Sequence, residues 1–573
     1  MSAKSNSRRL SLEGVVEMLR SRFGNLVKDV KVVSRNQAVV TVTRDSLPKV
    51  VLYLLKEAGI PEAQLSTVVG IDETPIKGFL SVTYWVSSNA GSGDVWIGVR
   101  AYLTLDDPVI RSVTPQHPGA NWYERENRDL LGIVPEGHPD PRRLVLPDDF
   151  PDGVYPLRKD YDYRRKDFSK PSYPFRMPSK DTIIVPFGPY HVACDEPFHF
   201  RLFVKGEEII DAEYRGFYNY RGIEKIAESR LTYDQIPFIA ERICGICGYT
   251  HACAYCQAVE AAAGIDVPER ALYIRSILLE IERLHSHLLW LGIACHLLGF
   301  DTGFMHSWRI REKLMWLAER LTGNRKTYGM NLVGGVRRDI LEYRKNLILR
   351  TLKELRREFR EFVNSLTSNK AFLRRCEGVG VLPYDKAVAY STVGPTARGS
   401  GRNIDVRRDH PYAAYKDLDF RVPVHKGGDV LSRALVRIEE IFESIWIIEQ
   451  ALDKLPGGPL REENIKVEPG AEGLGYTEAP RGENVHYVML GKHNRVYRWR
   501  PRASTYNNLP AVPEMLKGYT VADAPLIVAS IDPCFSCTER VVIIDVGSGK
   551  KEVLSEEEFN ALSVKASRRC LRG

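Results

Sequence analysis

The sequence predicts an α+β protein with a small α+β domain first and a large, mostly helical-bundle domain after it, with short strands at the edges of the bundle. The 573-residue length exceeds what one ordinary core can bury. Up to about residue 110, strand-like alternation is mixed with helical periodicity, whereas from Arg221 onward helical periodicity dominates. A basic, proline-punctuated stretch separates the two patterns. We therefore expect a domain over residues 1–165, a linker over 166–182, a second domain over 183–540 and a C-terminal extension over 541–573.

Composition limits the function classes. A chain with 44% hydrophobic and 27% charged residues is typical of a soluble globular protein. The net charge of +8 is modest and Lys and Arg are interspersed with Asp and Glu, so nucleic-acid binding is not indicated. The longest apolar stretch, Leu288–Phe300, is interrupted by His296 and is too short to cross a bilayer. Ten cysteines are too few for a disulfide scaffold, and no secretory signal is recognised, so we expect reduced cysteines in the cytoplasm.

In the first domain, helices are expected over residues 10–23 and 47–58 and strands over 30–33, 38–42, 79–86 and 95–102. Residues 119–160 are rich in turns and charges and show no metal-ligand spacing. His138, beside a proline, is expected to be structural.

In the second domain, Lys205-Gly206 predicts a hairpin between residues 200–204 and 207–213. Helices are expected over 251–263, from Pro268 through 298, and over 310–321, 340–366 and 430–455, followed by short strands over 486–490 and 496–500. A helical bundle of this kind readily holds metal sites between facing helices.

Two cysteine pairs far apart in the chain carry the chemistry. They are Cys244-Gly-Ile-Cys247 and Cys534-Phe-Ser-Cys537. Two Cys-x-x-Cys pairs can supply four thiolates to one metal centre, and tetrahedral zinc is the default interpretation. A zinc ribbon usually brings its two pairs closer together in sequence. The wide separation therefore favours a site that the fold closes.

The first pair precedes a predicted helix whose N-terminal partial positive charge would stabilise thiolates. His251, on the first turn, is placed to hydrogen-bond a metal-bound sulfur, or is an ordinary helix-start histidine. Cys253 and Cys256 extend the run to Cys-x2-Cys-x5-Cys-x2-Cys, which alone could hold an iron–sulfur cluster or zinc. On a regular helix face we expect them to be small core residues.

Two further segments are interpreted as structural. Gly394–Gly401 lacks the Gly-Lys-Ser/Thr ending of a phosphate loop, and we expect a structural loop near a subunit interface. His285 and His287, amid acidic and basic residues on a predicted helix, are expected to form a polar network at the edge of the core.

The cysteine motifs, Arg-Ile-Cys244-Gly-Ile-Cys247-Gly-Tyr-Thr-His251 and Asp532-Pro-Cys-Phe-Ser-Cys-Thr-Glu-Arg540, resemble those of the large subunit of nickel–iron hydrogenases. Asp195-Glu-Pro-Phe-His-Phe-Arg-Leu-Phe-Val204 and Arg221-Gly-Ile-Glu-Lys225 are most similar to the energy-converting, membrane-associated members of the formate hydrogenlyase and hydrogenase-4 type. The first domain resembles a peripheral-arm subunit of respiratory complex I through Trp122-Tyr-Glu-Arg-Glu126, Gly137-His-Pro-Asp140 and Pro156-Leu-Arg-Lys-Asp160. That subunit is a scaffold without a cofactor in its family.

The resemblance implies a set of metal ligands. Cys244 and Cys534 would be terminal nickel ligands, and Cys247 and Cys537 would bridge nickel and iron. The iron would carry carbon monoxide and cyanide. Soft thiolates suit such a redox pair, in which zinc could not transfer electrons.

The resemblance also implies roles around the metals. Arg481, next to Pro480, would lie above the metal pair, and Ser504 and Thr505 would fall in the segment that hydrogen-bonds a cyanide. Asp532 would pair with Arg481, or be a turn former before proline.

Two carboxylates and one arginine complete the set of candidate residues. Glu196 would pass protons from a terminal cysteine, with a solvated glutamate as the alternative. Glu224 matches a position that binds a structural divalent ion, such as magnesium, in some relatives, although Arg540 stands where those relatives have histidine. A maturation endopeptidase would cut after Arg540.

Three functions are open at this point. The first is the catalytic large subunit of a nickel–iron hydrogenase that interconverts H2 with protons and electrons. It would work with an iron–sulfur small subunit, a ferredoxin-like subunit and membrane subunits of complex I type on the cytoplasmic side of the cell membrane. The second is a complex I-like quinone or ferredoxin oxidoreductase subunit without nickel and iron, because that subunit shares the scaffold but lacks the four thiolates. The third is a structural zinc scaffold.

Overall fold

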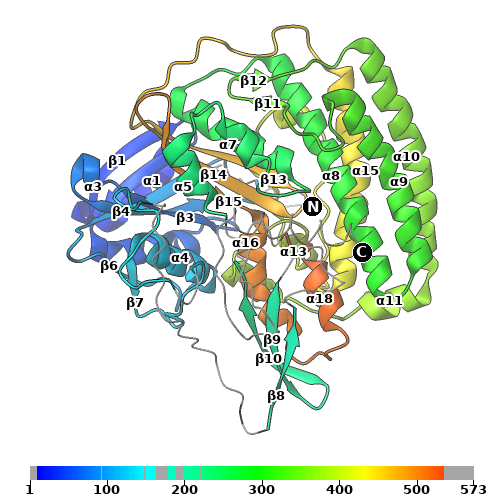
Figure 1. Ribbon diagram of the computed structural model, residues 1–573, viewed down its shortest axis with the longest axis horizontal. Coiled ribbons are helices and arrows are strands. Elements are labelled where there is room, and N and C mark those ends of the chain that lie inside the picture. Colours follow the sequence, from blue (N-terminus) through cyan, green and yellow to red (C-terminus); the bar gives the residue numbers. More distant parts are fainter. Residues whose placement is uncertain are drawn as a thin grey trace, which may run out of the picture.

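The computed structural model describes residues 10–91, 93–146, 150–162, 179, 181–188, 198–217 and 221–534. Its first part is a five-stranded sheet with the order β1-β2-β5-β4-β3, in which β2 and β5 are parallel and the other neighbours antiparallel (Figure 1, blue). The elements of this part are α1 (Leu12–Phe23), β1 (Val27–Ser34), β2 (Gln37–Val42), α2 (Leu47–Leu52), β3 (Gln64–Asp72), β4 (Leu80–Ser87) and β5 (Trp96–Leu103).

This sheet is shared between two hydrophobic cores. On β2, Val40 joins the core that contains α1 and α2, whereas its neighbour Val39 joins the core of the helical bundle. Tyr84 and Trp85 on β4 divide in the same way. Because successive side chains of a strand point to opposite faces, a sheet covered on both faces is apolar at every position. This explains why β3 and β4 are buried along their whole lengths.

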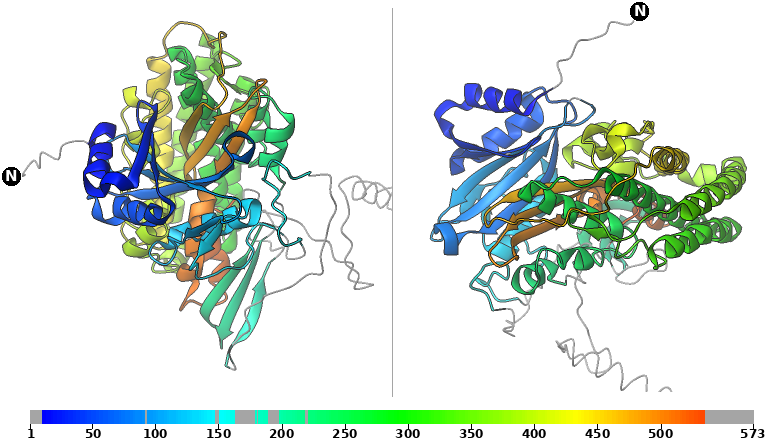
Figure 2. Two further views of the ribbon diagram at one scale, coloured as in Figure 1. Left: turned by 90° about the vertical axis from the view of Figure 1, so that its left-hand side faces the viewer. Right: turned by 90° about the horizontal axis from the view of Figure 1, so that it is seen from above.

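The second part combines a helical bundle with a three-stranded antiparallel sheet. The long helices are α8 (Glu269–Leu297), α9 (Asp301–Thr322), α10 (Glu342–Ser368) and α15 (Val430–Asp453), which lie side by side on the right of Figure 1. The sheet has the order β13-β14-β15, from Glu472–Ala479, Gly482–Leu490 and Val496–Arg502. In the second view of Figure 2 it lies between the N-terminal sheet and the bundle. The α+β fold class predicted from the sequence is confirmed.

Helix α7 (Gly248–Ala263) packs closely on β13 and β14. Two glycines on β13 make this possible, because a side chain at Gly473 or Gly475 would overlap carbonyl oxygens of α7. This close contact brings the start of α7 to the end of the sheet that carries Arg481.

The remaining elements are shorter. A second three-stranded sheet, β10-β9-β8, projects from the body of the molecule at the bottom of Figure 1. The bounds are β6 Val109–Arg111, α4 Asn121–Leu131, β7 Val134–Glu136, β8 Ile183–Phe187, β9 His199–Lys205, β10 Glu208–Arg215, α5 Ile223–Arg230, α6 Ile236–Ala240, β11 Asn331–Leu332, β12 Gly335–Val336, α11 Lys370–Cys376, α12 Tyr384–Ala389, α13 Gly394–Gly399, α14 Val406–Asp409, α16 Ser504–Asn508, α17 Val512–Leu516 and α18 Ala524–Ser530.

The predicted helices and strands are present, with ends shifted by a few residues. Strands β3 and β13 were not expected, and the turn-rich interpretation of residues 119–160 is wrong for α4. That helix is buried despite its charges because each carboxylate has partners. Glu124 accepts hydrogen bonds from Ser112, Thr114 and the Val113 amide, and Asp129 accepts three backbone amides. Most of the predicted linker lies outside the described residues.

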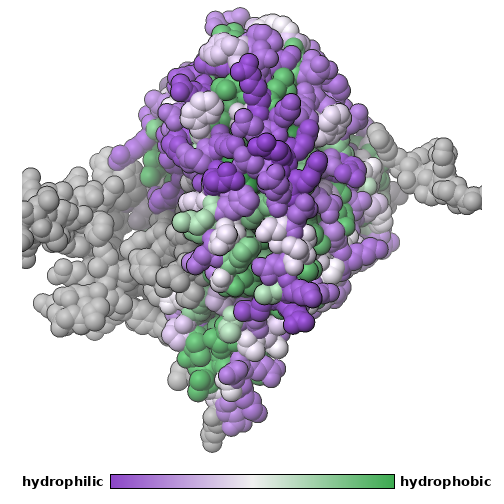
Figure 3. Space-filling view, turned by 90° about the vertical axis from the view of Figure 1, so that its right-hand side faces the viewer, coloured by the Kyte–Doolittle hydropathy of each residue, from purple (hydrophilic) through white to green (hydrophobic). Residues whose placement is uncertain are grey.

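Along the described part of the chain, no helix is both long and apolar enough to span a membrane. The side of the molecule formed by the bundle is mostly hydrophilic, with scattered apolar residues (Figure 3). Trp308 and Trp316 on α9 are exposed large side chains.

Candidate metal centre

Three of the four predicted cysteine ligands come together. Cys244 and Cys247, in the loop before α7, and Cys534, after α18, form one small buried cluster. The Sγ atoms of Cys534 and Cys244 lie 2.8 Å apart, although the residues are 290 positions apart in the chain. Cys537, Glu196 and Arg540 lie outside the described residues. The fold therefore closes the cluster, as the separation of the two pairs predicts.

The chemistry of this cluster suits a soft metal cation. Contact with the thiols of Cys244 and Cys534, together with burial, raises the pKa of the Cys247 thiol well above its ordinary value. Buried thiolates need a positive partner, and thiolates are the ligands that soft and borderline metals prefer. Sulfurs around a tetrahedral ion stand about 3.8 Å apart, so these must separate to receive one. Accordingly, no group of three or more His, Cys, Asp or Glu among the described residues is already spaced to hold an ion.

The loop that carries Cys244 and Cys247 is fixed by a carboxylate from the bundle. Cys247 is the N-cap of α7 but makes no side-chain cap. Instead Glu282 on α8 accepts the backbone N–H groups of Tyr249 and Thr250 at 2.8 and 3.0 Å, and also the Thr250 hydroxyl. Burial raises the pKa of Glu282 to about 7. From the other side, Tyr328 donates to the carbonyl of Cys244 at 3.0 Å.

Arg481 is held beside the cluster by Asp532. Pro480 and Arg481 form the buried two-residue turn between β13 and β14, where Ala479 pairs with Gly482. Arg481 donates from Nη2 to Asp532 Oδ1 at 2.6 Å and from Nε to the Asp532 carbonyl at 2.5 Å. Burial alone would lower the pKa of Arg481, but Asp532 and the three cysteines raise it above its ordinary value. A permanent positive charge therefore lies next to the thiols.

Ser504 and Thr505 support this arrangement from the start of α16. The Ser504 hydroxyl donates to the Gly482 carbonyl at 2.7 Å, and Thr505 Oγ1 accepts the backbone N–H of Cys534 at 3.1 Å. Ser504 thus holds the hairpin that carries Arg481, and Thr505 holds the backbone of a cysteine.

His251 is buried and its ring is engaged on one side. Its Nδ1 lies 3.0 Å from Nε2 of His486, whose Nδ1 accepts the indole N–H of Trp499 at 3.2 Å. Burial lowers the pKa of His251 to about 4. Nothing in the local sequence pattern indicated His486 or Trp499, because the contact joins α7 to the central sheet.

Glu224 is buried between two arginines. Arg498 donates to one of its carboxylate oxygens at 2.5 Å and Arg500 to the other at 3.1 Å. Both oxygens of the carboxylate considered for a divalent ion therefore already have arginine partners, which Glu224 shares with Glu228 and Glu126.

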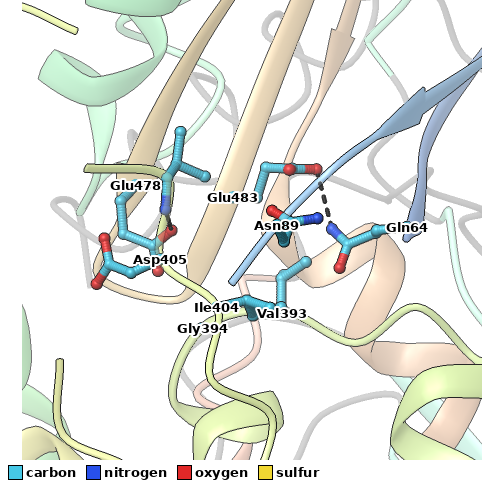
Figure 4. A pocket seen from close by; sticks show the side chains of 9 residues that line it. Gln64, Asn89, Val393, Gly394, Ile404, Asp405, Glu478 and Glu483 are labelled. Carbon is cyan, nitrogen blue, oxygen red and sulfur yellow. Dashed lines mark hydrogen bonds between the residues drawn. The ribbon is translucent and has the colours of Figure 1, made fainter. Parts of the chain in front are cut away.

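The hairpin with Arg481 rests on buried carboxylates. Glu478 and Glu483 lie directly opposite each other on β13 and β14, on either side of the turn. With Asp405, Gln64 and other residues they line an enclosed cavity of about 10 Å³, enough for about one water molecule (Figure 4). Burial and the charge of Asp405 raise the pKa of Glu478 to about 7.

The segment Gly394–Gly401 lies in this interior and includes the short helix α13, and its expected position near a subunit interface stays a prediction. Arg398 is fully buried and donates to Glu440 and, at 2.7 Å, to Glu478. Gly394 has φ = 62° and lies against the Arg481 carbonyl, which a side chain would overlap. His287 also joins this network, 2.6 Å from Glu440, whereas neither ring nitrogen of buried His285 has a hydrogen-bond partner among the described residues.

Cys253 and Cys256 are confirmed as core residues. Both are fully buried on α7, and they belong to two apolar clusters other than the one formed by the three site cysteines. The other cysteines that the structure describes, Cys295 and Cys376, are also buried and have no disulfide partner among the described residues.

Three family models match successive parts of the chain. They are "Respiratory-chain NADH dehydrogenase, 30 Kd subunit" at residues 40–167, "Nickel-dependent hydrogenase" at 221–301, and "Respiratory-chain NADH dehydrogenase, 49 Kd subunit" at 298–473 and 460–540. Formate hydrogenlyase subunit 5 of Escherichia coli K12 is 47% identical, over 95% of this chain and 96% of that protein. Hydrogenase-4 component G of the same organism is 45% identical over 98% of each. The chain belongs to the family of nickel-dependent hydrogenase large subunits.

The hydrogenase large subunit described here is therefore an oxidoreductase that acts on hydrogen at a nickel–iron centre. Its resemblance to the formate hydrogenlyase and hydrogenase-4 type is confirmed, as is the fusion to a part of complex I type. A similar fold is found in a chain of the membrane-bound sulfane sulfur reductase, an archaeal respiratory membrane complex. That chain is 34% identical, with a TM-score of 0.60, over 64% of this chain and all of that one. The hydrogenase relatives set aside the two alternatives without nickel.

Proposed function

We propose that Cys244, Cys247, Cys534 and Cys537 hold the nickel–iron centre. Cys244 and Cys534 would be the terminal nickel ligands, and Cys247 and Cys537 would bridge the two metals. The observation that carries this proposal is the contact of two buried sulfurs, 2.8 Å apart, from opposite ends of the domain. Arg481 adds a positive charge that stays fixed because guanidinium groups do not titrate in the working range.

The bound centre supplies the redox-active, Lewis-acidic site at which H2 is cleaved heterolytically. The protein's own groups then handle the proton. Cys534 would accept it at Sγ and pass it to Glu196, a carboxylate whose proton affinity rises when it is desolvated. Asp532 holds Arg481 beside the cysteines, and the positive charge of the Arg481 guanidinium would favour the thiolate form of those cysteines.

The iron is proposed to carry carbon monoxide and cyanide, and the two hydroxyls of α16 differ in whether they can donate a hydrogen bond to a cyanide. The Ser504 hydroxyl already donates its hydrogen bond to the Gly482 carbonyl. Thr505 Oγ1 accepts the backbone N–H of Cys534, so its own O–H is available to donate. Thr505 is therefore the better candidate. At Glu224 we propose that Arg498 and Arg500 take the place of the magnesium ion, since both carboxylate oxygens are occupied.

The partners follow from where electrons and protons must go. We propose an iron–sulfur small subunit that receives the electrons, a ferredoxin-like subunit, and membrane subunits of complex I type. Residues 1–165 would be the scaffold that joins these parts, and the complex would sit on the cytoplasmic side of the cell membrane. A maturation endopeptidase would remove residues 541–573 after Arg540.

Metal analysis with infrared spectroscopy tests the centre. We expect nickel and iron in equal amounts in the isolated large subunit, with absorption bands of metal-bound carbonyl and cyanide. Zinc without nickel, or no metal, would contradict the proposal.

Substitution of one ligand tests its assignment. Cys534→Ser should abolish H2-dependent dye reduction and lower the nickel content, because a buried thiolate ligand is lost. Cys256→Ser is the matched control, since Cys256 is equally buried on α7 but lies in another cluster. The ligand assignment fails if the Cys534 variant keeps its activity.

The processing step has its own test. The mass of the large subunit in active enzyme should correspond to a chain that ends at Arg540. A subunit that still contains Gly573 would refute cleavage.

A further inference from the structure

Three buried side chains from three elements form a line that ends at the metal centre. Trp499 on β15, His486 on β14 and His251 on α7 are almost completely excluded from solvent. The indole Nε1 lies 3.2 Å from His486 Nδ1, and His486 Nε2 lies 3.0 Å from His251 Nδ1.

The fold builds this line with specific pairings. On β15, Pro501 lies opposite His486, so Trp499, two residues away, is the diagonal neighbour of the histidine. On β13, Gly475 lies opposite His486. Because that position has no side chain, α7 can approach the sheet until His251 reaches His486.

The direction of the hydrogen bonds is forced by the tryptophan. An indole N–H can only donate, so His486 Nδ1 must carry a lone pair. A neutral imidazole then carries its proton on Nε2, and His486 donates to His251 Nδ1. The reverse direction would put a proton on His486 Nδ1, facing the indole N–H. Burial keeps both rings neutral, because it lowers the pKa values of His251 and His486.

We propose that Trp499 and His486 are positioning residues that fix the tautomer of His251, so that its Nε2 carries the proton and is offered as a hydrogen-bond donor to the cysteine cluster. His251 lies one helical turn after Cys247, and its backbone N–H donates to the Cys247 carbonyl at 3.4 Å. Burial lowers the pKa of His251, and the nearby Cys244 thiol opposes this effect. With Nδ1 engaged by His486, Nε2–H is the only polar group of the ring that remains. A donor there stabilises a metal-bound thiolate, whereas a lone pair would repel it.

This proposal rests on the proposed nickel–iron site in one respect only, which is the group that accepts the hydrogen bond from His251 Nε2–H. The tautomer itself is a property of the protein chain. The tautomer of His251 can therefore be determined before metal loading. Failure of the metal assignment and failure of the Trp499–His486–His251 hydrogen-bond chain are then separate results.

The first experiment is 15N NMR of the full chain with 15N-labelled histidine, with signals assigned through His251→Gln and His486→Gln. Both histidines should show the shifts of the tautomer protonated at Nε2. In Trp499→Phe, which keeps a ring but removes the donor, both should become mixtures of tautomers. A His251 protonated at Nδ1 in the unsubstituted chain, or an unchanged pattern in Trp499→Phe, would overturn the proposal.

The second experiment uses the metal-loaded complex. Trp499→Phe should lower H2 oxidation about tenfold and shift the infrared bands of the iron ligands, because the hydrogen bond to a ligand sulfur becomes intermittent. Trp85→Phe is the matched control, since this indole on β4 is equally buried and its Nε1 has no hydrogen-bond partner among the described residues. It should leave the bands in place. Equal band shifts in the two variants would show general loosening of the core and refute a specific role for Trp499.

Discussion

The interior next to the N-terminal sheet and the interior beneath the metal centre differ in the polarity of their buried side chains. The first is apolar, with Leu47, Val50 and Leu54 packed against the strands. The second contains Arg398, Arg407, Glu280 and Glu440, all at most 1% exposed. Apolar packing is not directional and tolerates small shifts, whereas buried ions fix the orientation of each partner. The difference indicates that the first interior supplies stability and the second also supplies orientation.

The orienting network reaches the site through few steps. Arg398 links α13 to Glu440 on α15 and to Glu478 on β13, three residues before Arg481. Arg407 links Asp405 to Glu280 on α8. The hairpin with Arg481 is therefore tied to two helices of the bundle by charges that have no access to water.

The largest expected effect comes from breaking that network. Arg398→Met should lower the free energy of unfolding by about 3–5 kcal/mol, because it leaves buried carboxylates without their cation. It should also lower H2 oxidation per folded molecule. Urea unfolding and dye reduction measure the two. Arg421→Met, at a largely exposed arginine paired with Glu443, is the control and should cost about 0–1 kcal/mol. Similar losses in both variants would remove the contrast between the two interiors.

A cavity in the apolar interior should separate stability from activity. Leu54→Ala should cost about 2–4 kcal/mol, because Leu54 is buried against the sheet. Activity per folded molecule should stay the same at a temperature where the variant is folded. A drop in the activity of fully folded Leu54→Ala would show that the N-terminal sheet also orients the site.

A substitution at the boundary between the two interiors should lower the free energy of unfolding by an intermediate amount. Arg100 on β5 donates to Glu472 on β13 at 2.6 Å, and Trp96 stacks on Tyr476 with ring centroids 4.7 Å apart. Arg100→Met should cost about 1–3 kcal/mol. Hydrogen exchange should rise on β5 and β13 and stay unchanged in α9 and α10. Exchange that rises equally in the whole chain would mean that the contact is not local.

The sequence was sufficient wherever a signal was local. The Cys-x-x-Cys pairs, the amphipathic helices and the hairpin at Lys205-Gly206 depend on neighbours in the chain. Pairing of Arg481 with Asp532 was anticipated only because the family motif contains both. The resemblance also supplied the identity of the metals, which four thiolates alone left open to zinc.

Where partners are distant, no local sequence pattern indicated the contact. The charges of α4 suggested a solvated turn region, but Glu126 is buried against Arg500, 374 residues away. Arg398, in a segment expected to be a structural loop, donates to Glu478, 80 residues away. His486 and Trp499 lie 13 residues apart, yet their alignment with His251 depends on α7 lying against β13. A charged residue is predicted to be buried only when its counter-charge is known, because an unpaired buried charge is costly.

The last expected effect is a difference in pH dependence between two buried glutamates, with a slope of at most about 1.4 kcal/mol per pH unit. The pKa of Glu478 is raised to about 7 by burial and by Asp405, whereas Arg100 and Tyr487 overcome the effect of burial and lower that of Glu472 to about 2. A raised carboxyl pKa means that the folded state binds the proton more tightly than the unfolded chain. Stability from Glu478 is therefore full below about pH 4.5 and lost as pH rises toward 7. Stability from Glu472 is present above about pH 4.5 and lost as pH falls toward 2.

Replacing either glutamate by glutamine should remove the pH dependence of stability that comes from that residue. Relative to the unsubstituted protein, Glu478→Gln should gain stability as pH rises from 5 to 7, by at most about 1.4 kcal/mol per pH unit. Glu472→Gln should instead recover relative stability as pH falls below 4. Urea midpoints over this range measure both differences. If the two variants respond with the same sign, the Glu478 carboxyl group beneath the Arg481 turn is not held in its protonated form.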